Sequence, residues 1–368
     1  MITLIKNATI FPVTYPSFVG DILIKDSTIS ELGIHLSVED NAENIKIIDA
    51  TGHFVFPGFI DAHTHLGMYN EGVGWEGKDT NELTQPVAPF LRAIDSVNPQ
   101  DIAFKEALSH GITAVQVLPG SFNPIGGLTS VIKTHGSNIS DMIVRANNSL
   151  KIALGENPKS KHKLTRMGIM GLIRKAFIDA MTKEETFENV SLKRVLRKEI
   201  PIRVHAHQAN DILSIIRLAE EFDLDLRIEH CTEGHLIVDE LVKNNPFVTV
   251  GPTMSARSKY ETRYKTFETY KVLSDAGINI SITTDHPYME VRYLPLAAAI
   301  AVKEGLSEQT ALEAITINPA KNIGVEDVMG SLEIGKHADI VVWDKHPFDI
   351  MAKPLKTLIN GNLVFSRN

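Results

Sequence analysis

Residues 56–65 read Phe56-Pro57-Gly58-Phe59-Ile60-Asp61-Ala62-His63-Thr64-His65, an apolar run that ends in two histidines. Side chains of a β-strand alternate between its faces, so residues two apart lie about 6.5–7 Å apart on the same side. Both imidazoles can therefore converge on one ion, and neutral imidazole nitrogen suits zinc and its neighbours in the first transition series. The stretch predicts a strand whose end forms one edge of a metal site.

Three more short apolar runs each lead to a candidate ligand. Residues 202–204 precede His205, residues 224–229 precede His230, and residues 278–284 precede Asp285. Apolar residues at helical spacing predict helices near 212–222 and 236–242, between these runs. A repeated order of strand, ligand and helix is typical of a parallel α/β barrel, in which the carboxyl ends of all strands meet at one mouth. We therefore expect these distant residues to meet.

Taken together, the runs resemble the amidohydrolase superfamily of metal-dependent (β/α)8-barrel (TIM-barrel) hydrolases, and within it the imidazolonepropionase-like branch. The resemblance extends over nearly the whole chain, and the matching segments are 57–65, 204–207, 228–230, 284–287, 318–320 and 330–342. The resemblance implies that one or two divalent ions are bound by His63, His65, His205, His230 and Asp285.

The resemblance also implies a bridging group from the fourth barrel strand, either a carboxylated lysine or a glutamate. Residues 150–159 contain both Lys151 and Glu156. We expect Glu156 to be the metal ligand because it follows the apolar run, where the chain reaches the barrel mouth, and a carboxylated Lys151 is the alternative. On the fifth strand His205 and His207 share a face. Relatives carry their ligand at the first of these positions, so we expect His205 to bind metal and His207 to bind substrate, with exchanged roles as the alternative.

The ligand set predicts hydrolysis. A divalent ion lowers the pKa of bound water to about 7 in favourable sites, which produces hydroxide at neutral pH. The resemblance implies that Asp285 accepts the proton from this water and passes it to the leaving nitrogen, as a general acid and base. Zinc is the default ion for a histidine-rich site, although manganese, iron, cobalt and nickel are also compatible with it.

The segment His205-Ala206-His207-Gln208 lacks the acid that deaminases and imidazolonepropionases of the superfamily place shortly after the ligand histidine. This favours hydrolysis of a linear or cyclic amide. A deaminase or an imidazolonepropionase-like ring-opening hydrolase is the alternative, and a non-catalytic binding barrel is the alternative of another class. Basic residues in two loops favour a small-molecule substrate that carries a carboxylate, held by Arg166 or Arg257. His286 is a further substrate-binding candidate.

Composition and net charge limit the class of protein, its compartment and its partners. With 368 residues, of which 43% are hydrophobic and 22% charged, the chain can bury a large core. The single cysteine, Cys231, excludes an intramolecular disulfide framework, and the absence of a signal-peptide layout predicts a cytoplasmic protein. No apolar run is long enough for a membrane span. The net charge of -8 argues against nucleic acid as a partner, and a homo-oligomer is compatible with these bounds. Strand alternation sends Cys231 away from the face of His230 and predicts a buried structural thiol.

Both chain ends have the short alternating runs of β-structure. We predict a small β-sandwich domain from residues 1–56 plus 331–368, with the metal-dependent barrel domain at 57–330 inserted between its halves.

Overall fold

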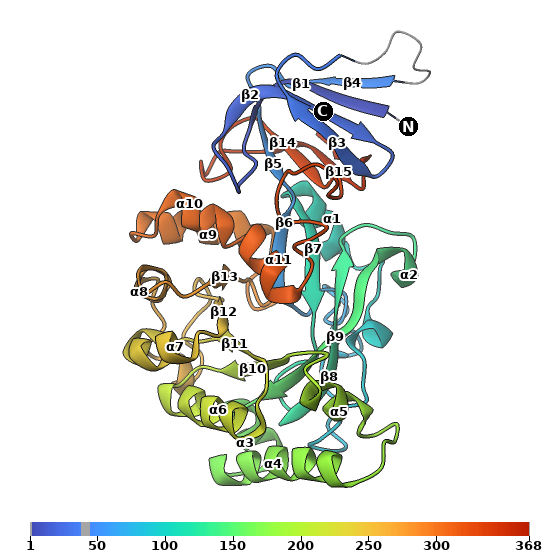
Figure 1. Cartoon of the computed structure of the whole chain (residues 1–368). Coiled ribbons are helices and arrows are strands. Elements are labelled where there is room, and N and C mark those ends of the chain that lie inside the picture. Colours follow the sequence, from blue (N-terminus) through green and yellow to red (C-terminus); the bar gives the residue numbers. More distant parts are fainter. Residues whose placement is uncertain (1, 38–44, 368) are drawn as a thin grey trace.

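The structure, a computed structural model that describes residues 2–37 and 45–367, contains two eight-stranded sheets (Figure 1). One sheet is built from both ends of the chain and lies at the top of Figure 1. The other sheet nearly closes into a barrel below it. The chain passes from the first sheet to the second at Gly58, between β5 (Phe54–Pro57) and β6 (Phe59–Thr64).

The barrel sheet keeps its strands in chain order. These strands are β6 (Phe59–Thr64), β7 (Ile112–Val117), β8 (Ile125–Lys133), β9 (Ile143–Ala153), β10 (Ile202–Ala206), β11 (Leu226–His230), β12 (Phe247–Val250) and β13 (Ile280–Ile282). Five adjacent pairs are parallel: β6 with β7, and the four successive pairs from β9 to β13. The predicted eight-stranded α/β barrel is therefore present in outline, and its strands supply the candidate site.

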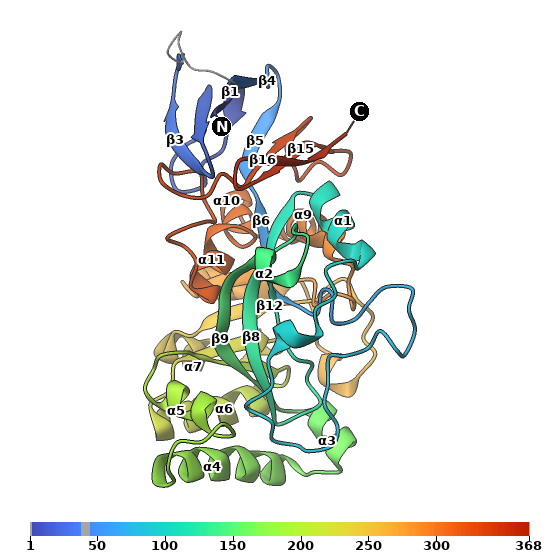
Figure 2. The same ribbon diagram turned by 90° about the vertical axis from the view of Figure 1, so that its right-hand side faces the viewer.

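One strand departs from the expected parallel barrel. β8 is antiparallel to both β7 and β9. Only residues 118–124 connect β7 to β8, and a parallel crossover needs a dozen or more residues, whereas antiparallel strands accept a short connection. The expectation of eight parallel βα units was wrong at this position. Figure 2 shows β8 and β9 as a long ribbon along the barrel.

The seam between β13 and β6 is bridged by another segment of the chain. The Ile282 N–H donates to the Ala314 carbonyl over 2.9 Å, and the Ile60 N–H donates to the Ile315 carbonyl over 2.8 Å. Buried backbone groups need such partners. Residues 314–315 thus take the place of direct strand pairing, and the barrel is nearly closed.

Helices connect most of the barrel strands and cover the barrel. They are α1 (Ile102–Ser109), α2 (Ile139–Met142), α3 (Glu156–His162), α4 (Arg166–Thr182), α5 (Val190–Leu196), α6 (Ala209–Phe222), α7 (Val238–Asn244), α8 (Glu268–Asp275), α9 (Leu294–Lys303), α10 (Glu308–Glu313) and α11 (Ile317–Ile323). The helices predicted near 212–222 and 236–242 correspond to α6 and α7. In α6 the apolar stripe that includes Ile212, Ile215 and Ile216 is buried against the barrel strands. Among the residues described, no helix has both the length and the apolar character needed to cross a bilayer.

The two chain ends pair in one connected sheet. Its order is β16 (Asn362–Ser366), β15 (Pro354–Ile359), β14 (Ile340–Trp343), β5, β1 (Ile2–Ile10), β2 (Phe18–Lys25) and β3 (Thr28–Gly33), with β4 (Ile45–Asp49) beside β1. Apolar side chains from both ends share a core, for example Ile5 and Ile22 with Ile340 and Val342. The strands form a single sheet by hydrogen bonding, so the two-sheet sandwich and its boundaries stay a prediction.

Side chains tie this sheet to the barrel. The rings of Phe59 and Trp343 lie 5.6 Å apart between centroids, and Lys133 of β8 forms a buried ion pair with Asp339. The Gly111 backbone lies so close to Trp343 that a Cβ there would be 2.8 Å from the indole. These contacts hold the end sheet against the bottom of the barrel, away from the carboxyl ends of its strands.

Candidate metal centre and substrate pocket

The first group of candidate ligands consists of His63, His65 and Asp285, called here the aspartate group. His63 lies in β6, His65 follows that strand, and Asp285 follows β13. Asp285 Oδ1 is 3.4 Å from His63 Nε2 and 3.3 Å from His65 Nε2. The ligand atoms of all three residues lie within 4.8 Å of one another. The alternation predicted from His-x-His thus brings both rings to the same ion-sized space.

The second group consists of His205, His207 and His230, called here the three-histidine group. His205 belongs to β10, His207 follows it, and His230 ends β11. Their ligand atoms also lie within 4.8 Å of one another, and all three side chains are buried. The structure therefore brings together both histidines of the fifth barrel strand, although the sequence called for only one of them as a ligand.

Each ring of the three-histidine group is held through Nδ1. This atom lies 2.9 Å from Ser121 Oγ in His205, 2.7 Å from Thr232 Oγ1 in His207 and 2.8 Å from the Gly251 carbonyl in His230. The opposite nitrogens, Nε2, are left to face the barrel mouth. Histidines that bind metals are usually oriented in this way by a partner on the other ring nitrogen.

Backbone geometry explains how His230 and Asp285 reach the mouth. Their φ angles are 70° and 49°, in the left-handed region that residues other than glycine rarely adopt. Regular alternation would send His230 away from the face of Glu229. Because the chain turns at His230, the two neighbours both contribute to the centre. Such strained residues concentrate at functional sites.

A buried chain of charges supports His63. His63 Nδ1 lies 2.7 Å from Glu229 Oε2, and Glu229 Oε1 lies 2.7 Å from Arg203 Nη2. Burial alone would raise the pKa of Glu229, but Arg203 and His63 outweigh this effect and lower it. An ionised Glu229 accepts the Nδ1 proton of His63, which leaves the Nε2 lone pair free for a ligand bond.

The structure shows where both candidates of the fourth barrel strand lie. Lys151 of β9 is fully buried, and its Nζ lies 3.3 Å from His63 Nε2. Glu156 instead starts α3, where its backbone N–H donates to Glu261 Oε2, and its carboxylate belongs to neither candidate metal group among the described residues. The strand ends at Ala153, so Glu156 lies beyond it, beside the mouth, and its role as a metal ligand stays a prediction. Lys151 is the residue that reaches the centre.

Burial keeps the imidazoles of the three-histidine group neutral. Burial, followed by repulsion from neighbouring histidines, holds the pKa of His205 and His230 well below the usual value. Burial lowers the pKa of His207 to about 4. Burial would raise the pKa of Asp285, but the imidazoles of His63 and His65 close to its carboxylate outweigh this effect and hold the pKa well below its usual value. Neutral imidazole and ionised carboxylate are the forms that bind divalent metals.

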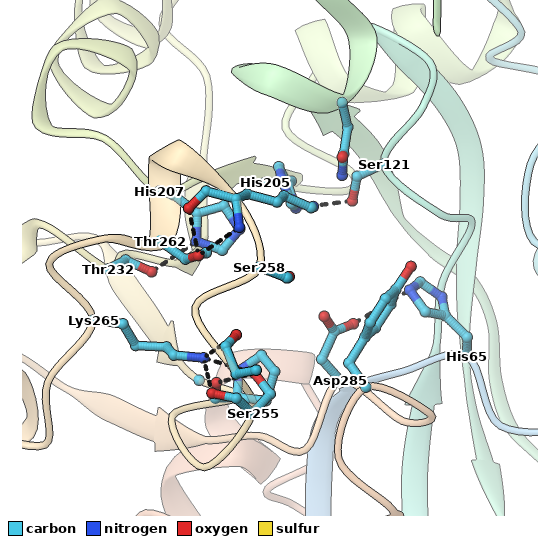
Figure 3. Close-up of a pocket in the computed structure, with 16 residues that line it drawn as sticks. His65, Ser121, His205, His207, Thr232, Ser255, Ser258, Thr262, Lys265 and Asp285 are labelled. Carbon is cyan, nitrogen blue, oxygen red and sulfur yellow. Dashed lines mark hydrogen bonds and ion pairs between the residues drawn. The ribbon is translucent and has the colours of Figure 1, made fainter. Parts of the chain in front are cut away.

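The two groups face each other across a pocket (Figure 3). Figure 3 shows His65 and Asp285 on one side, with His205 and His207 on the other. The enclosed part of this pocket amounts to about 60 Å³. Residues of the loop after β12 complete the lining: Ser255, Ala256, Ser258, Lys259, Thr262 and Lys265.

Two predicted substrate contacts are elsewhere. Arg166 is absent from the residues that line this pocket, and its Nε donates to Asp211 over 2.7 Å in an ion pair at the start of α4. Arg257 is exposed, donates to the Lys265 carbonyl and does not line the pocket. Arg257 belongs to the loop after β12, as predicted, whereas Arg166 is the first residue of α4. Lys259 and Lys265 are the cationic residues that line the pocket instead.

The two remaining substrate-binding candidates lie in different places relative to the pocket. His207 lines the pocket, whereas His286 is fully buried beside it and its Nε2 lies 3.8 Å from Glu71 Oε1. Burial lowers the pKa of His286 to about 4.

Cys231, as predicted, is a free and buried thiol, and burial raises its pKa to about 12. It packs in the main apolar core.

The donor set fits divalent metal. Among the described residues, His205 Nε2, His230 Nε2 and Asp285 Oδ1 are buried without a hydrogen-bond partner. Unpaired buried polar atoms are costly, and several of them converging on one space fit a bound cation. Nitrogen and carboxylate donors are those that zinc and related ions prefer.

Sequence reasoning missed three residues of the site. Ser121 and Thr232 hold histidine rings, and Glu261 reaches the three-histidine group from the loop after β12. A lone acid between Lys259 and Arg263 has the pattern of surface charge, so spacing gave no signal for it. All three become visible only when the loops are placed over the barrel mouth.

Comparison with known proteins agrees with this architecture. A family model described as Amidohydrolase family matches residues 54–364. The chain is 28% identical to Amidohydrolase tasK of Hapsidospora irregularis over 95% of its own length, and spans 40% of that longer protein. It is 25% identical to the imidazolonepropionase of Picrophilus torridus, over 97% of both chains. The crystal structure of an amidohydrolase from Thermotoga maritima MSB8 is 41% identical, with a TM-score of 0.96 over 99% of this chain and 100% of the other.

Proposed function

Because the chain belongs to the amidohydrolase family, we propose that it is a metal-dependent hydrolase that cleaves the carbon–nitrogen bond of a small amide or cyclic amide. Relatives at the level of the family support a hydrolase. The observation that carries the finer proposal is the pair of ligand groups that face each other across one pocket. A barrel that only binds a ligand would not require two full groups of metal ligands, two of them on strained backbone.

One ion would be held by the aspartate group and another by the three-histidine group. Lys151 is the fourth-strand residue at the centre, as a free amine or in the carboxylated form known in the superfamily. Zinc is the default, given histidine and carboxylate donors. When bound, a divalent ion supplies a Lewis acid for the substrate carbonyl and lowers the pKa of water.

In this proposal Asp285 moves the proton. Its low pKa keeps it ionised at neutral pH, so its carboxylate can accept a proton from the attacking water. The Asp285 N–H donates to Thr283 Oγ1 over 3.0 Å, which fixes the turn that presents the side chain. Return of this proton to the departing nitrogen makes the amine a better leaving group and completes the hydrolysis.

The pocket supports a substrate that carries a carboxylate. Lys259 lines the pocket, and its side chain is 28% exposed, so its ammonium group can reach a ligand. Ser255 and Ser258 offer hydroxyl donors in the same loop. An N-acylated amino acid or a dipeptide would match this combination of charge and hydrogen bonding.

A ring-opening hydrolase or a deaminase is the second candidate. Glu261 places a buried carboxylate 3.7 Å from His205 Nε2, near the position where the fifth-strand segment itself lacks an acid. Such an acid could protonate a ring nitrogen. A cytoplasmic location, the absence of nucleic-acid partners and a homo-oligomeric state stay predictions.

The test is a substrate panel with purified protein loaded with Zn²⁺ or Mn²⁺. The panel contains N-acetyl amino acids, their carboxamide analogues, dipeptides, cyclic imides, lactams and amino-heterocycles. We expect amine release from amides, and faster release when the substrate keeps its carboxylate. Asp285→Asn should lower kcat by about 10²–10⁴-fold at equal metal content. Asp275→Asn, on the surface in α8, should leave kcat unchanged. Ammonia from an amino-heterocycle without cleavage of any amide would overturn the proposal.

A further inference from the structure

A second cleft lies at the opposite end of the barrel from the mouth. It opens between the loop after β1 and the helices α10 and α11, which Figure 1 shows beneath the end sheet. Asn279 lines it and directly precedes β13, whereas Asp285 follows the carboxyl end of the same strand. The cleft has a volume of about 730 Å³, within the range of about 300–1,000 Å³ that small-molecule sites occupy. It is therefore large enough for a ligand and separate from the metal centre.

Strained backbone forms one wall of this cleft. Val13 has a φ of 79°, and the left-handed region is a genuine outlier for a β-branched residue. Gln309 Nε2 of α10 donates to the Val13 carbonyl over 2.9 Å and so holds this conformation. Backbone strain of this kind persists where the surrounding structure imposes it, and it is often found at ligand clamps. The wall is thus fixed in position before any ligand binds.

Two opposite charges line the cleft without contacting each other. Lys321 lies in the last turn of α11, and Glu313 ends α10. Within the described part of the chain no ion pair joins them, and the Lys321 ammonium group has no hydrogen-bond partner. Glu313 Oε1 accepts one bond, from Gln309 Nε2 over 2.7 Å, which leaves Oε2. A cation and an anion are therefore both available to a ligand.

The rest of the lining suits peptide groups and apolar side chains. The carboxamides of Asn279, Gln309 and Asn318 each carry a donor and an acceptor, as a peptide group does. Asn318 Nδ2 donates to the Ile280 carbonyl over 3.2 Å, so its Oδ1 remains an acceptor for the cleft. Apolar surface completes the floor and the rim: Phe11, Val13, Tyr15, Pro16, Leu312 and Ile317.

We propose that this cleft binds a short peptide with free termini and apolar side chains. The peptide ammonium group pairs with Glu313 and its carboxylate with Lys321, because charge-assisted hydrogen bonds are the stronger kind. The three carboxamides bind the peptide groups between the termini, and this row of amides, with the volume of the cleft, favours a peptide over a single amino acid. The site goes beyond the proposed hydrolase function, since it uses neither candidate metal group nor the pocket at the mouth.

The experiment is isothermal titration calorimetry on the full chain loaded with Zn²⁺. The ligand is leucyl-alanyl-leucine with free termini, and the same peptide is also used with an N-acetyl group or a C-terminal amide. Every protein carries Asp285→Asn, which slows any hydrolysis at the mouth. Lys321→Ala and Glu313→Gln remove the two charges of the cleft. Lys303→Ala and Glu308→Gln are matched controls, because both side chains are exposed and do not line it.

We expect the free tripeptide to bind the Asp285→Asn protein and both controls equally well. Lys321→Ala and Glu313→Gln should each weaken binding about 10–100-fold, the usual loss for a hydrogen bond to a charged group. N-acetylation should weaken binding, but no further in Glu313→Gln, and amidation should weaken it, but no further in Lys321→Ala. The modified peptides also test the protein without changes in the cleft, so the result does not depend on how the variants fold.

Lys259→Ala separates the cleft from the mouth, because Lys259 lines the pocket there. If Lys259→Ala weakens binding of the tripeptide and Lys321→Ala does not, the peptide binds at the mouth and the proposal is overturned. Absence of binding overturns it as well, and so does an equal loss on N-acetylation with and without Glu313→Gln. None of these results bears on the proposed hydrolase function, which the substrate panel tests separately.

Discussion

Removal of Arg203 should destabilise the protein far more than removal of a comparable surface arginine. Arg203 and Glu229 are both completely buried, and Arg203 Nη2 lies 2.7 Å from Glu229 Oε1. Arg203 also donates to the Ala62 and Asn322 carbonyls over 3.2 Å. Arg203→Met would leave the Glu229 charge buried without its cation, and such a change typically costs 3–5 kcal/mol.

Arg174 provides the matched control. Its Nε lies 2.8 Å from Glu221 Oε1, nearly the same distance, but the two side chains are 40% and 41% exposed. Water solvates both charges after the pair is broken, so Arg174→Met should cost about 0–1 kcal/mol. The comparison isolates burial, because residue type and contact distance are almost the same in the two pairs.

The free energy of unfolding is measured by urea denaturation in EDTA, so that metal binding does not contribute. The double variant Arg203→Met/Glu229→Gln removes both charges and keeps a carbonyl oxygen for His63. We expect it to be more stable than the sum of the single variants predicts, by about 2–3 kcal/mol, as a coupling energy for neighbouring residues. The explanation of the buried chain of charges is refuted if Arg203→Met lowers the free energy of unfolding no more than Arg174→Met. It is also refuted if the effects of the single variants add.

Two further predictions concern the centre and its pH dependence. Ser121→Ala should weaken metal binding about 10–100-fold, because His205 loses the hydroxyl that orients its ring. Competition with a chromogenic chelator measures the affinity. An unchanged affinity would contradict this role of Ser121. Stability of the metal-free protein should fall as pH drops from 7 to 5. Burial lowers the pKa of His286 to about 4, and the unfolded chain, with a pKa near 6.5, binds the proton first. This residue alone should lower the free energy of unfolding by about 2 kcal/mol between pH 7 and pH 5, and His286→Gln should lack this loss. The free energy is measured by urea denaturation at each pH. The same change with pH in both proteins would contradict the prediction.

The grouping of the candidate ligands could be predicted from the sequence because local rules govern it. The apolar runs before His63, His205, His230 and Asp285 form strands, these residues lie near or just beyond the strand ends, and parallel strands bring such ends to one mouth. The helices α6 and α7 followed from apolar spacing in the same way.

The ends and directions of the strands were harder to predict. The sequence favours Glu156 over Lys151 because Glu156 follows the apolar run. In the structure β9 ends at Ala153, and Lys151, within the strand, is the side chain that lies near His63. Strand β8 runs antiparallel because of a short connection, although its own composition is that of any buried strand.

The sequence by itself determined the α/β barrel, the family and the histidines and aspartate that line the mouth, because two-residue alternation and strand–ligand–helix order are local properties of the chain. Only the tertiary structure decided that Lys151 and Glu261 reach the centre, that Arg166 is engaged by Asp211, and that Glu229 and Arg203 support His63. These contacts join residues far apart in the chain, and their geometry depends on how loops and side chains pack over the barrel.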